Sequence, residues 1–292
     1  MKKTFDVTRD AVKVRLRVGK FRGYRTSKQL RNEAAKKHQA DEESITGGVK
    51  LLRREDVRLL ESIVSQARNQ IAAVTWTWED GALCPVENYA ALEKMVGELE
   101  REFLDAAGAL VGRYDELVKD AKGRLNGLAA THRFPTQAEF RDKFYWRFCT
   151  DRVTDPAEVT FNGISREAQA RIKGNITERV EEQLNEAQAE VIARLTETIA
   201  HVKEQLTGTN GKKSKVVTKA LWKNLADTLD VLPTLNIFGD AKVNELIEMA
   251  KSQIAAVAVE DVQKDKKLRK ALAADAETIL SDLANFGIGG GK

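Results

Sequence analysis

Residues 165–206 read SREAQARIKGNITERVEEQLNEAQAEVIARLTETIAHVKEQL, and this stretch decides the fold class. Its apolar residues recur every three or four positions, which is the spacing of one face of an α-helix. They are Ile172, Ile176, Val180, Leu184, Ala187, Val191, Leu195, Ile199, Val202 and Leu206. A helix of this length would extend about 60 Å. We therefore expect a long amphipathic helix and an elongated molecule.

A second apolar stripe of similar length comes earlier in the chain, between Leu92 and Leu125. It predicts one helix of about 40 residues beginning near Pro85, and a shorter helix is expected from about Arg53 to Trp76. Both long stripes have an average step above 3.6 residues, which favours straight pairing over a heptad supercoil. The default expectation is that they pair within one chain.

The remaining segments predict smaller elements at both ends. Val12, Val14, Leu16 and Val18 alternate with cations, as in a half-buried strand. Gly208 to Lys215, GTNGKKSK, reads as a linker, followed by helices expected at about 214–231, 240–259 and 260–285. The fold class is thus predicted as mainly α, an elongated bundle built on two long helices, with a small N-terminal β element and a C-terminal helical group. The expected domains are 1–46, 47–207 and 214–292.

Composition excludes several classes of protein. The chain has 292 residues, of which 42% are hydrophobic, so wholesale disorder is not expected. The longest apolar run, Ile254 to Val259, is far too short for a membrane span, and no signal peptide follows Met1. Cys84 and Cys149 form no CxxC or disulfide framework. We expect a cytoplasmic protein, in the bacterial host cytoplasm if it is phage-encoded, with no membrane partner.

Charge is concentrated at the N-terminus. Residues 1–37 hold thirteen Lys or Arg against three acidic residues, and the rest of the chain has a net charge of −6. The candidate nucleic-acid-binding residues are Lys13, Arg15, Arg17, Lys20, Arg22 and Arg25. Clustered cations of this kind bind phosphates and release counterions. The alternative is an edge strand that charge protects against mispairing, or a contact with the acidic body of the same chain.

A second candidate surface lies between Arg133 and Phe148. Six aromatic residues occur there among four cations, namely Phe134, Phe140, Phe144, Tyr145, Trp146 and Phe148 with Arg133, Arg141, Lys143 and Arg147. Bases stack on aromatic rings while guanidinium groups hold phosphates, so this pattern is compatible with a single-stranded nucleic acid or a partner groove. The favoured interpretation is a core helix, because Phe140, Phe144 and Phe148 are spaced by four. Trp76 and Trp78 are expected to close the same core.

The long helix at 165–206 also has a glutamate-rich face, which is either a solvated acidic face or the contact for a basic partner. The candidate interaction residues are Glu178, Glu182, Glu186 and Glu190, together with Arg141 and Arg147.

The inventory of catalytic residues is thin. The chain has three histidines and two cysteines, and no phosphate-binding loop is recognisable because GTNGKKSK lacks the glycine spacing. His201 has Glu197 and Glu204 as helical neighbours, but only one such histidine occurs where a di-iron site would need two. We therefore expect no metal, no cofactor and no enzymatic activity.

The order of several segments resembles a known family. These segments are AVKVRLRVGKFRGYRTSKQL (11–30), GGVKLLRREDVRLLESIVSQARNQI (47–71), LCPVENYAALEKMVGELEREFLDAAGALVGRYDEL (83–117) and RFPTQAEFRDKF (133–144). They resemble the uncharacterised bacterial and phage family called domain of unknown function three-one-five-zero over about residues 11–160, with Phe21 where a tryptophan is expected. The resemblance implies a genetic context beside MoxR-type AAA+ ATPases and von Willebrand factor A proteins, and it transfers no catalytic residues.

Three functions therefore compete. The leading hypothesis is a non-enzymatic interaction or assembly protein of a phage or mobile element, acting as an adaptor or substrate of an AAA+ ATPase or assembling with itself. The second is a nucleic-acid-binding protein that uses the basic N-terminal strand. The third is a virion or scaffold component.

Overall fold

The computed structural model describes residues 5–21, 23–131, 133–207 and 217–289, and it is mainly helical with a small antiparallel sheet. These features confirm the predicted fold class. The chain divides into two compact units. Unit 1 contains residues 1–14, 71–90 and 150–292, and unit 2 contains residues 15–70 and 91–149. Both units are therefore built from segments that are far apart in the sequence.

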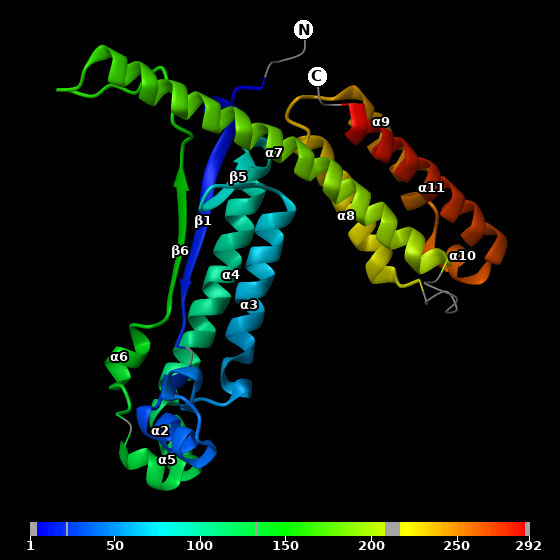
Figure 1. The fold of residues 1–292 in the computed structure, drawn as a ribbon. Helices are drawn as coiled ribbons and strands as arrows, with labels where there is room; N and C mark the ends of the chain where they lie inside the picture. The colour runs from blue at the N-terminus through cyan, green and yellow to red at the C-terminus, as the bar shows by residue number, and fades with distance from the viewer. Residues whose placement is uncertain (1–4, 22, 132, 208–216, 290–292) are drawn as a thin grey trace. The chain divides into compact units, whose positions relative to one another are not determined.

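The main sheet has four strands in the order β4-β5-β1-β6. They are β1 (Ala11–Gly19), β4 (Trp76–Trp78), β5 (Gly81–Pro85) and β6 (Tyr145–Asp151). β4 and β5 form a hairpin, and β1 pairs antiparallel with β5 in a register that places Lys13 opposite Leu83. β6 lies beside β1 and runs in the opposite direction (Figure 1). The predicted N-terminal strand is thus an inner strand of the sheet.

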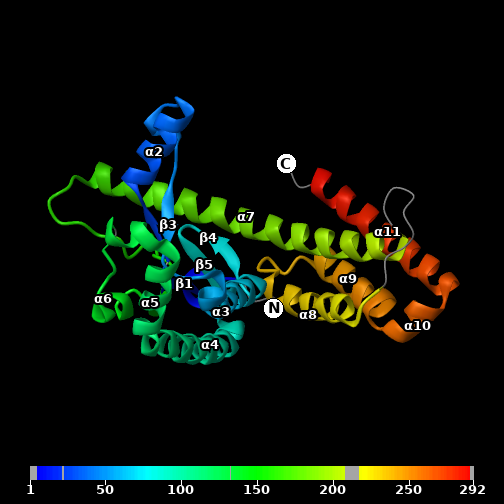
Figure 2. The same ribbon diagram turned by 90° about the horizontal axis from the view of Figure 1, so that it is seen from below.

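Unit 1 is built around α7 (Arg166–Thr207), the long helix predicted from its apolar stripe. The other helices are α1 (Val7–Asp10), α8 (Lys219–Leu235), α9 (Ala241–Ala250), a π-helical turn (Lys251–Ala255), α10 (Val259–Lys264) and α11 (Lys266–Gly289). In Figure 2, α8 and α11 lie along the C-terminal half of α7. Val191, Leu195 and Ile199 of α7 are fully buried in the same core as Leu229 of α8 and Ile279 of α11. The C-terminal helices therefore pack on α7.

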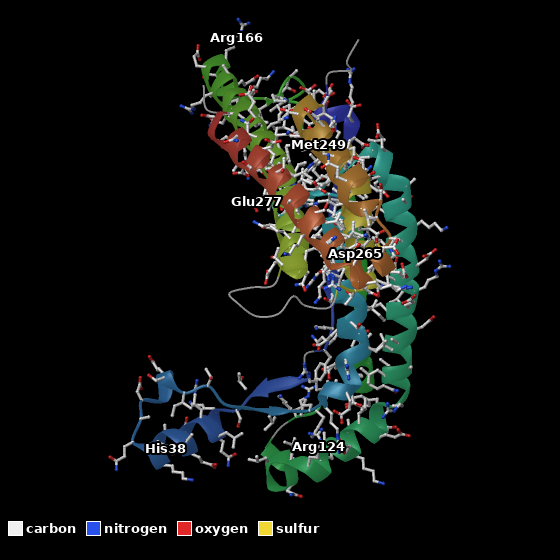
Figure 3. The ribbon with its side chains drawn as sticks, turned by 90° about the vertical axis from the view of Figure 1, so that its right-hand side faces the viewer. His38, Arg124, Arg166, Met249, Asp265 and Glu277 are labelled. Carbon is white, nitrogen blue, oxygen red and sulfur yellow. The ribbon has the colours of Figure 1, made fainter. Side chains whose placement is uncertain are left out.

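Two boundaries in the C-terminal helices differ from the prediction. The first of these expected helices, at about 214–231, does not stop before Pro233, because α8 continues through this residue to Leu235, which is fully buried. Burial there outweighs the hydrogen bond that proline cannot donate. The last expected helix is divided at Asp265, labelled in Figure 3, whose backbone is extended between α10 and α11. Its side chain accepts hydrogen bonds from the N–H groups of Lys267 and Leu268 and so caps α11.

Unit 2 has the remaining helices. They are α2 (Lys28–His38), α3 (Arg54–Ala73), α4 (Val86–Gly112), α5 (Tyr114–Leu125) and α6 (Gln137–Arg141), with short 3-10 turns at Glu42–Ser44 and Asn126–Thr131. A second sheet pairs β2 (Tyr24–Thr26) with β3 (Gly48–Lys50). The apolar stripe of α4, from Leu92 to Leu110, is buried. Helices α3 and α4 and strands β1 and β6 each begin in one unit and end in the other.

The second long stripe does not form one helix. α4 ends at Gly112 and α5 begins at Tyr114, although Leu110 and Leu117 on either side are both buried. Glycine disfavours a helix by about 1 kcal/mol relative to alanine, so Gly112 is a weak point in the helix. The hydroxyl group of Tyr114 donates to the carbonyl of Pro135, and its ring packs against Phe140. The two long stripes also belong to different units, and that of α7 packs with α8 and α11.

The predicted aromatic helix through Phe140, Phe144 and Phe148 is wrong. α6 ends at Arg141, and Phe148 lies in β6. Aromatic residues favour strands, and pairing with β1 satisfies the backbone of this segment. Its expected role in a core is correct for Phe140, which is fully buried and contacts Phe144 with ring centroids 5.1 Å apart.

The tryptophans of β4 belong to the other core. Trp76 is fully buried in unit 1, where its indole N–H donates to the carbonyl of Leu235 at 3.0 Å and its ring contacts Phe5. Trp78 is in the same core. They therefore do not join Phe140, which lies in unit 2.

The expected domain limits differ from the two units. Residues 1–46 are divided after Val14, residues 47–207 contribute to both units, and residues 217–289 share a core with α7. The predicted linker Gly208–Lys215 lies outside the described residues. No helix in the described part of the chain is long and apolar enough to cross a membrane.

Candidate nucleic-acid interface

Alternation along β1 separates its cations from its apolar residues. Successive side chains of a strand point to opposite faces, so Lys13, Arg15 and Arg17 share one face of β1, and Val14 lies on the other. Val14 is almost completely buried, whereas Arg17 is exposed. The strand therefore presents a cationic face, as the sequence predicted.

The neighbouring strand β6 alternates in the same way. Tyr145 and Arg147 are exposed, and Trp146 between them is buried. The indole ring of Trp146 packs against Phe103 of α4, with ring centroids 5.4 Å apart. This contact holds one face of β6 against α4, so Tyr145 and Arg147 lie on the opposite face.

A close approach between the two strands shows that their exposed faces coincide. A Cβ atom placed on Gly19, the last residue of β1, would lie 2.2 Å from a ring carbon of Tyr145. The ring of Tyr145 therefore lies on the face of β1 that carries Arg17, two residues before Gly19. Because the strands are antiparallel, Arg147 lies on the same side of this contact as Arg17. We call Arg17, Tyr145 and Arg147 the β1–β6 patch.

The patch combines an aromatic ring with cations. Tyr145 is 44% exposed, and the guanidinium carbon of Arg147 is 5.3 Å from the centroid of its ring. This geometry is a cation–π contact, which keeps the guanidinium group beside the ring. Arg17 makes no hydrogen bond or ion pair with the described residues. Two cations and an aromatic ring are thus available to a ligand at one surface.

Several residues of the predicted basic site have internal roles instead. Lys13 forms an ion pair with Glu79 and lies 3.4 Å from Asp80, and Arg179 of α7 adds a contact of 3.3 Å to Glu79. The hydrogen bond from Lys13 holds the pKa of Glu79 below its usual range. For Lys13, contact with the acidic body of the chain is therefore the observed state.

The rest of the predicted basic set is divided among several places. Lys20 pairs with Glu61 of α3 at 2.8 Å, and its hydrogen bond lowers the pKa of that carboxyl group. Arg15 is half-buried and already takes part in an interaction. Arg25 lies in β2, and Arg22 is outside the described residues. The structure therefore leaves Arg17 as the most accessible of the predicted cations on β1.

The candidate interaction residues are also divided between internal and exposed positions. Glu190 accepts a hydrogen bond from the N–H of Thr77 at 3.0 Å and pairs with Arg194, so it holds the β4–β5 hairpin on α7. Glu186 accepts one from the amide of Gln183. Glu178 and Glu182 are exposed. Of the two arginines, Arg141 is exposed and lies 3.8 Å from Asp142, whereas Arg147 belongs to the β1–β6 patch.

His201 lies in a groove of unit 1. The groove has a volume of about 260 Å³ and is lined by Glu197 and His201 of α7 and by Asn224 and Thr228 of α8, among others. Across the described ranges, no cluster of three or more His, Cys, Asp or Glu side chains could hold a metal ion. Burial raises the pKa of the Cys84 thiol to about 12, which disfavours the reactive thiolate form.

Sequence reasoning found both halves of the β1–β6 patch but did not join them. The alternation at 145–148 indicates a strand as readily as the spacing of four indicates a helix, and Gly19 at the end of a charged strand marks a close approach. The pairing of β1 with β6 joins segments more than 120 residues apart, so no local sequence pattern predicts it.

No protein-family model, curated protein or solved structure matches the chain, so the family resemblance stays an expectation.

Proposed function

We propose that this protein binds nucleic acid through the β1–β6 patch. The observation that carries the proposal is that Arg17 and Arg147, from two stretches far apart in the sequence, lie on one face beside an exposed tyrosine. Guanidinium groups contact phosphates as charged hydrogen-bond donors, and an aromatic ring contacts bases. Like charges on adjacent strands destabilise the free protein, so an anionic ligand relieves their repulsion.

The proposed role is non-enzymatic, and its support is the thin inventory of catalytic residues in the sequence. The helix α2 is also basic, since its last turn carries Lys36, Lys37 and His38, the last of them labelled in Figure 3, and its cations would attract a polyanion. The resemblance to the phage family supports a protein that binds nucleic acid in a phage or mobile element. Because that nucleic acid lies in the host cytoplasm, we also propose a cytoplasmic location.

The experiment measures binding of a fluorescent 20-nucleotide DNA by anisotropy at about 50 and 200 mM salt. With the two phosphate contacts of Arg17 and Arg147, affinity for a single strand should fall about 7-fold over this range. The double variant Arg17→Glu, Arg147→Glu should bind at least tenfold more weakly than the native protein at low salt. The matched control is Arg68→Glu, Arg171→Glu, which makes the same charge change at two exposed helical positions. Equal loss in both variants would show that net charge alone drives binding and would overturn the proposal.

A protein-binding role is the second candidate, because Glu178 and Glu182 form an exposed acidic surface on α7. A basic partner, including an AAA+ ATPase or a second copy of this chain, would fit this surface, as would a role in assembly of a virion or scaffold. Pull-down from the host with the native protein and with Glu178→Lys, Glu182→Lys tests it. A partner retained equally by both proteins would contradict docking at this surface.

A further inference from the structure

The ring of Tyr145 occupies space that any other residue at position 19 would fill. A Cβ atom on Gly19 would be 2.2 and 2.4 Å from two ring carbons and 2.8 Å from the carbonyl oxygen of Lys143. Real Cβ atoms do not approach other atoms so closely. The carbonyl oxygen of Lys143 is part of the backbone, so it cannot move aside as the end of a flexible side chain can. Glycine at this position therefore allows the aromatic ring to lie directly on the adjacent strand.

This packing leaves the ring accessible. Tyr145 is among the large side chains that remain exposed, although its neighbour Trp146 is buried against α4. Contact with β1 on one side and with the guanidinium group of Arg147 at 5.3 Å restricts the ring in the free protein. A side chain that is already ordered loses less conformational entropy when it binds a ligand. Tyr145 is thus exposed and positioned in advance.

We propose that Tyr145 is a base-stacking platform and that the β1–β6 patch selects single-stranded nucleic acid over duplex. This inference rests on the proposed function and adds the ligand class. In a duplex the bases are stacked on one another, so their flat faces are not available to a protein ring. In a single strand one base takes the place of the guanidinium group of Arg147 on the ring of Tyr145, and Arg147 and Arg17 then contact the flanking phosphates. A site that used phosphates alone would favour duplex, which has the higher charge density.

The test compares a 20-nucleotide single strand with a 20-base-pair duplex of the same sequence, at one salt concentration. The native protein should bind the single strand more tightly. Tyr145→Leu fills the space above Gly19 without an aromatic face, and it should weaken single-strand binding by about 5- to 150-fold, the range for loss of one stacked base. Its duplex binding should not change. Tyr145→Phe retains the ring and should retain the preference for the single strand.

A second pair of variants moves the ring without removing it. Gly19→Ala forces the ring of Tyr145 away from β1, so it should reduce the preference for the single strand. Gly108→Ala is the control, because a Cβ there meets nothing within 4 Å. Thermal unfolding of each variant establishes that it is folded.

The outcomes separate the two proposals. If Tyr145→Leu weakens binding of the single strand and of the duplex equally, or weakens neither, the stacking role is overturned. The proposed phosphate contacts of Arg17 and Arg147 would still stand in that case. A native protein that binds neither ligand at low salt would overturn the proposed function itself. A native preference for duplex would exclude the single-strand selectivity.

Discussion

At the scale of single residues, Asp120 joins α5 to the start of α3. Its carboxylate accepts hydrogen bonds from Arg53 at 2.5 and 3.1 Å and from Arg124 at 2.7 Å. The hydrogen bond from Arg53, followed by that from Arg124, holds the pKa of Asp120 well below its usual range. The group is at the surface, where solvent weakens ion pairs, so its contribution to stability is modest.

This shift predicts the direction of one pH effect. Because the folded pKa is depressed, the unfolded chain takes up the proton first, and the contribution of Asp120 is present above about pH 4 and is lost as the pH falls below it. Urea unfolding between pH 6 and pH 2 should therefore show a shallower acid loss in Asp120→Asn than in the native protein. Asp105→Asn, an exposed position on α4, is the control. Parallel curves for all three proteins would contradict the prediction.

Trp76 carries a second prediction at this scale. The side chain is fully buried, and its indole N–H donates to the carbonyl of Leu235. Trp76→Phe removes this donor, which leaves the carbonyl of Leu235 with only the N–H of Ile237, and the smaller ring leaves space in the core. The free energy of unfolding should therefore fall by about 1–3 kcal/mol. Denaturant unfolding followed by circular dichroism measures the change. Leu59→Ala, at an exposed position on α3, should change it by less than about 0.5 kcal/mol.

At the scale of elements, α7 could be predicted almost to the residue, whereas the break between α4 and α5 could not. Every step in the stripe of α7 is supported by local spacing, and the stripe is buried in the core from Ala187 to Leu206. Gly112 gives only a weak signal of interruption, and the reason for the break, Tyr114 packing on Phe140, comes from a segment beyond it. The strand β6 was missed because its pairing with β1 is not visible in the local pattern.

The start of α9 gives a prediction that local sequence does support. Asp240 immediately precedes this helix, and its carboxylate accepts hydrogen bonds from the N–H groups of Lys242 and Val243 at 2.8 and 3.2 Å. Asp240→Ala should lower the free energy of unfolding by about 1 kcal/mol, the usual value of such a cap. Asp105→Ala in the interior of α4 should have a much smaller effect. Chemical unfolding of both variants measures the change. Equal losses of unfolding free energy in Asp240→Ala and Asp105→Ala would contradict a capping role for Asp240.

At the scale of the whole molecule, the core of unit 1 needs residues from both ends of the chain. Ala11, Trp76, Leu195 and Ile279 are buried in one cluster. In the sequence GTNGKKSK reads as a linker, and composition alone leaves open whether the helices beyond it pack on α7. The division into units is therefore the least predictable level of this structure.

Removing residues 208–292 tests this organisation. Val191, Leu195 and Ile199 would lose α8 and α11, so α7 should exchange its amide hydrogens rapidly in the shortened chain. The buried stripe of α4, from Leu92 to Leu110 in unit 2, should keep more of its protection. Hydrogen exchange read by mass spectrometry distinguishes the two regions. Native protection of α7 without these residues would contradict a shared core.

The interleaving of the two units also has a consequence for how the chain is made. A ribosome releases the N-terminus first, at about 5–20 residues per second. Every residue of unit 2 has been synthesised once Cys149 is joined to the chain, whereas unit 1 must wait for α11. Ala11 and Trp76 therefore remain without their final neighbours while more than a hundred further residues are translated. During that interval the apolar residues of the unfinished core are exposed on the nascent chain, and we expect chaperones to bind it then.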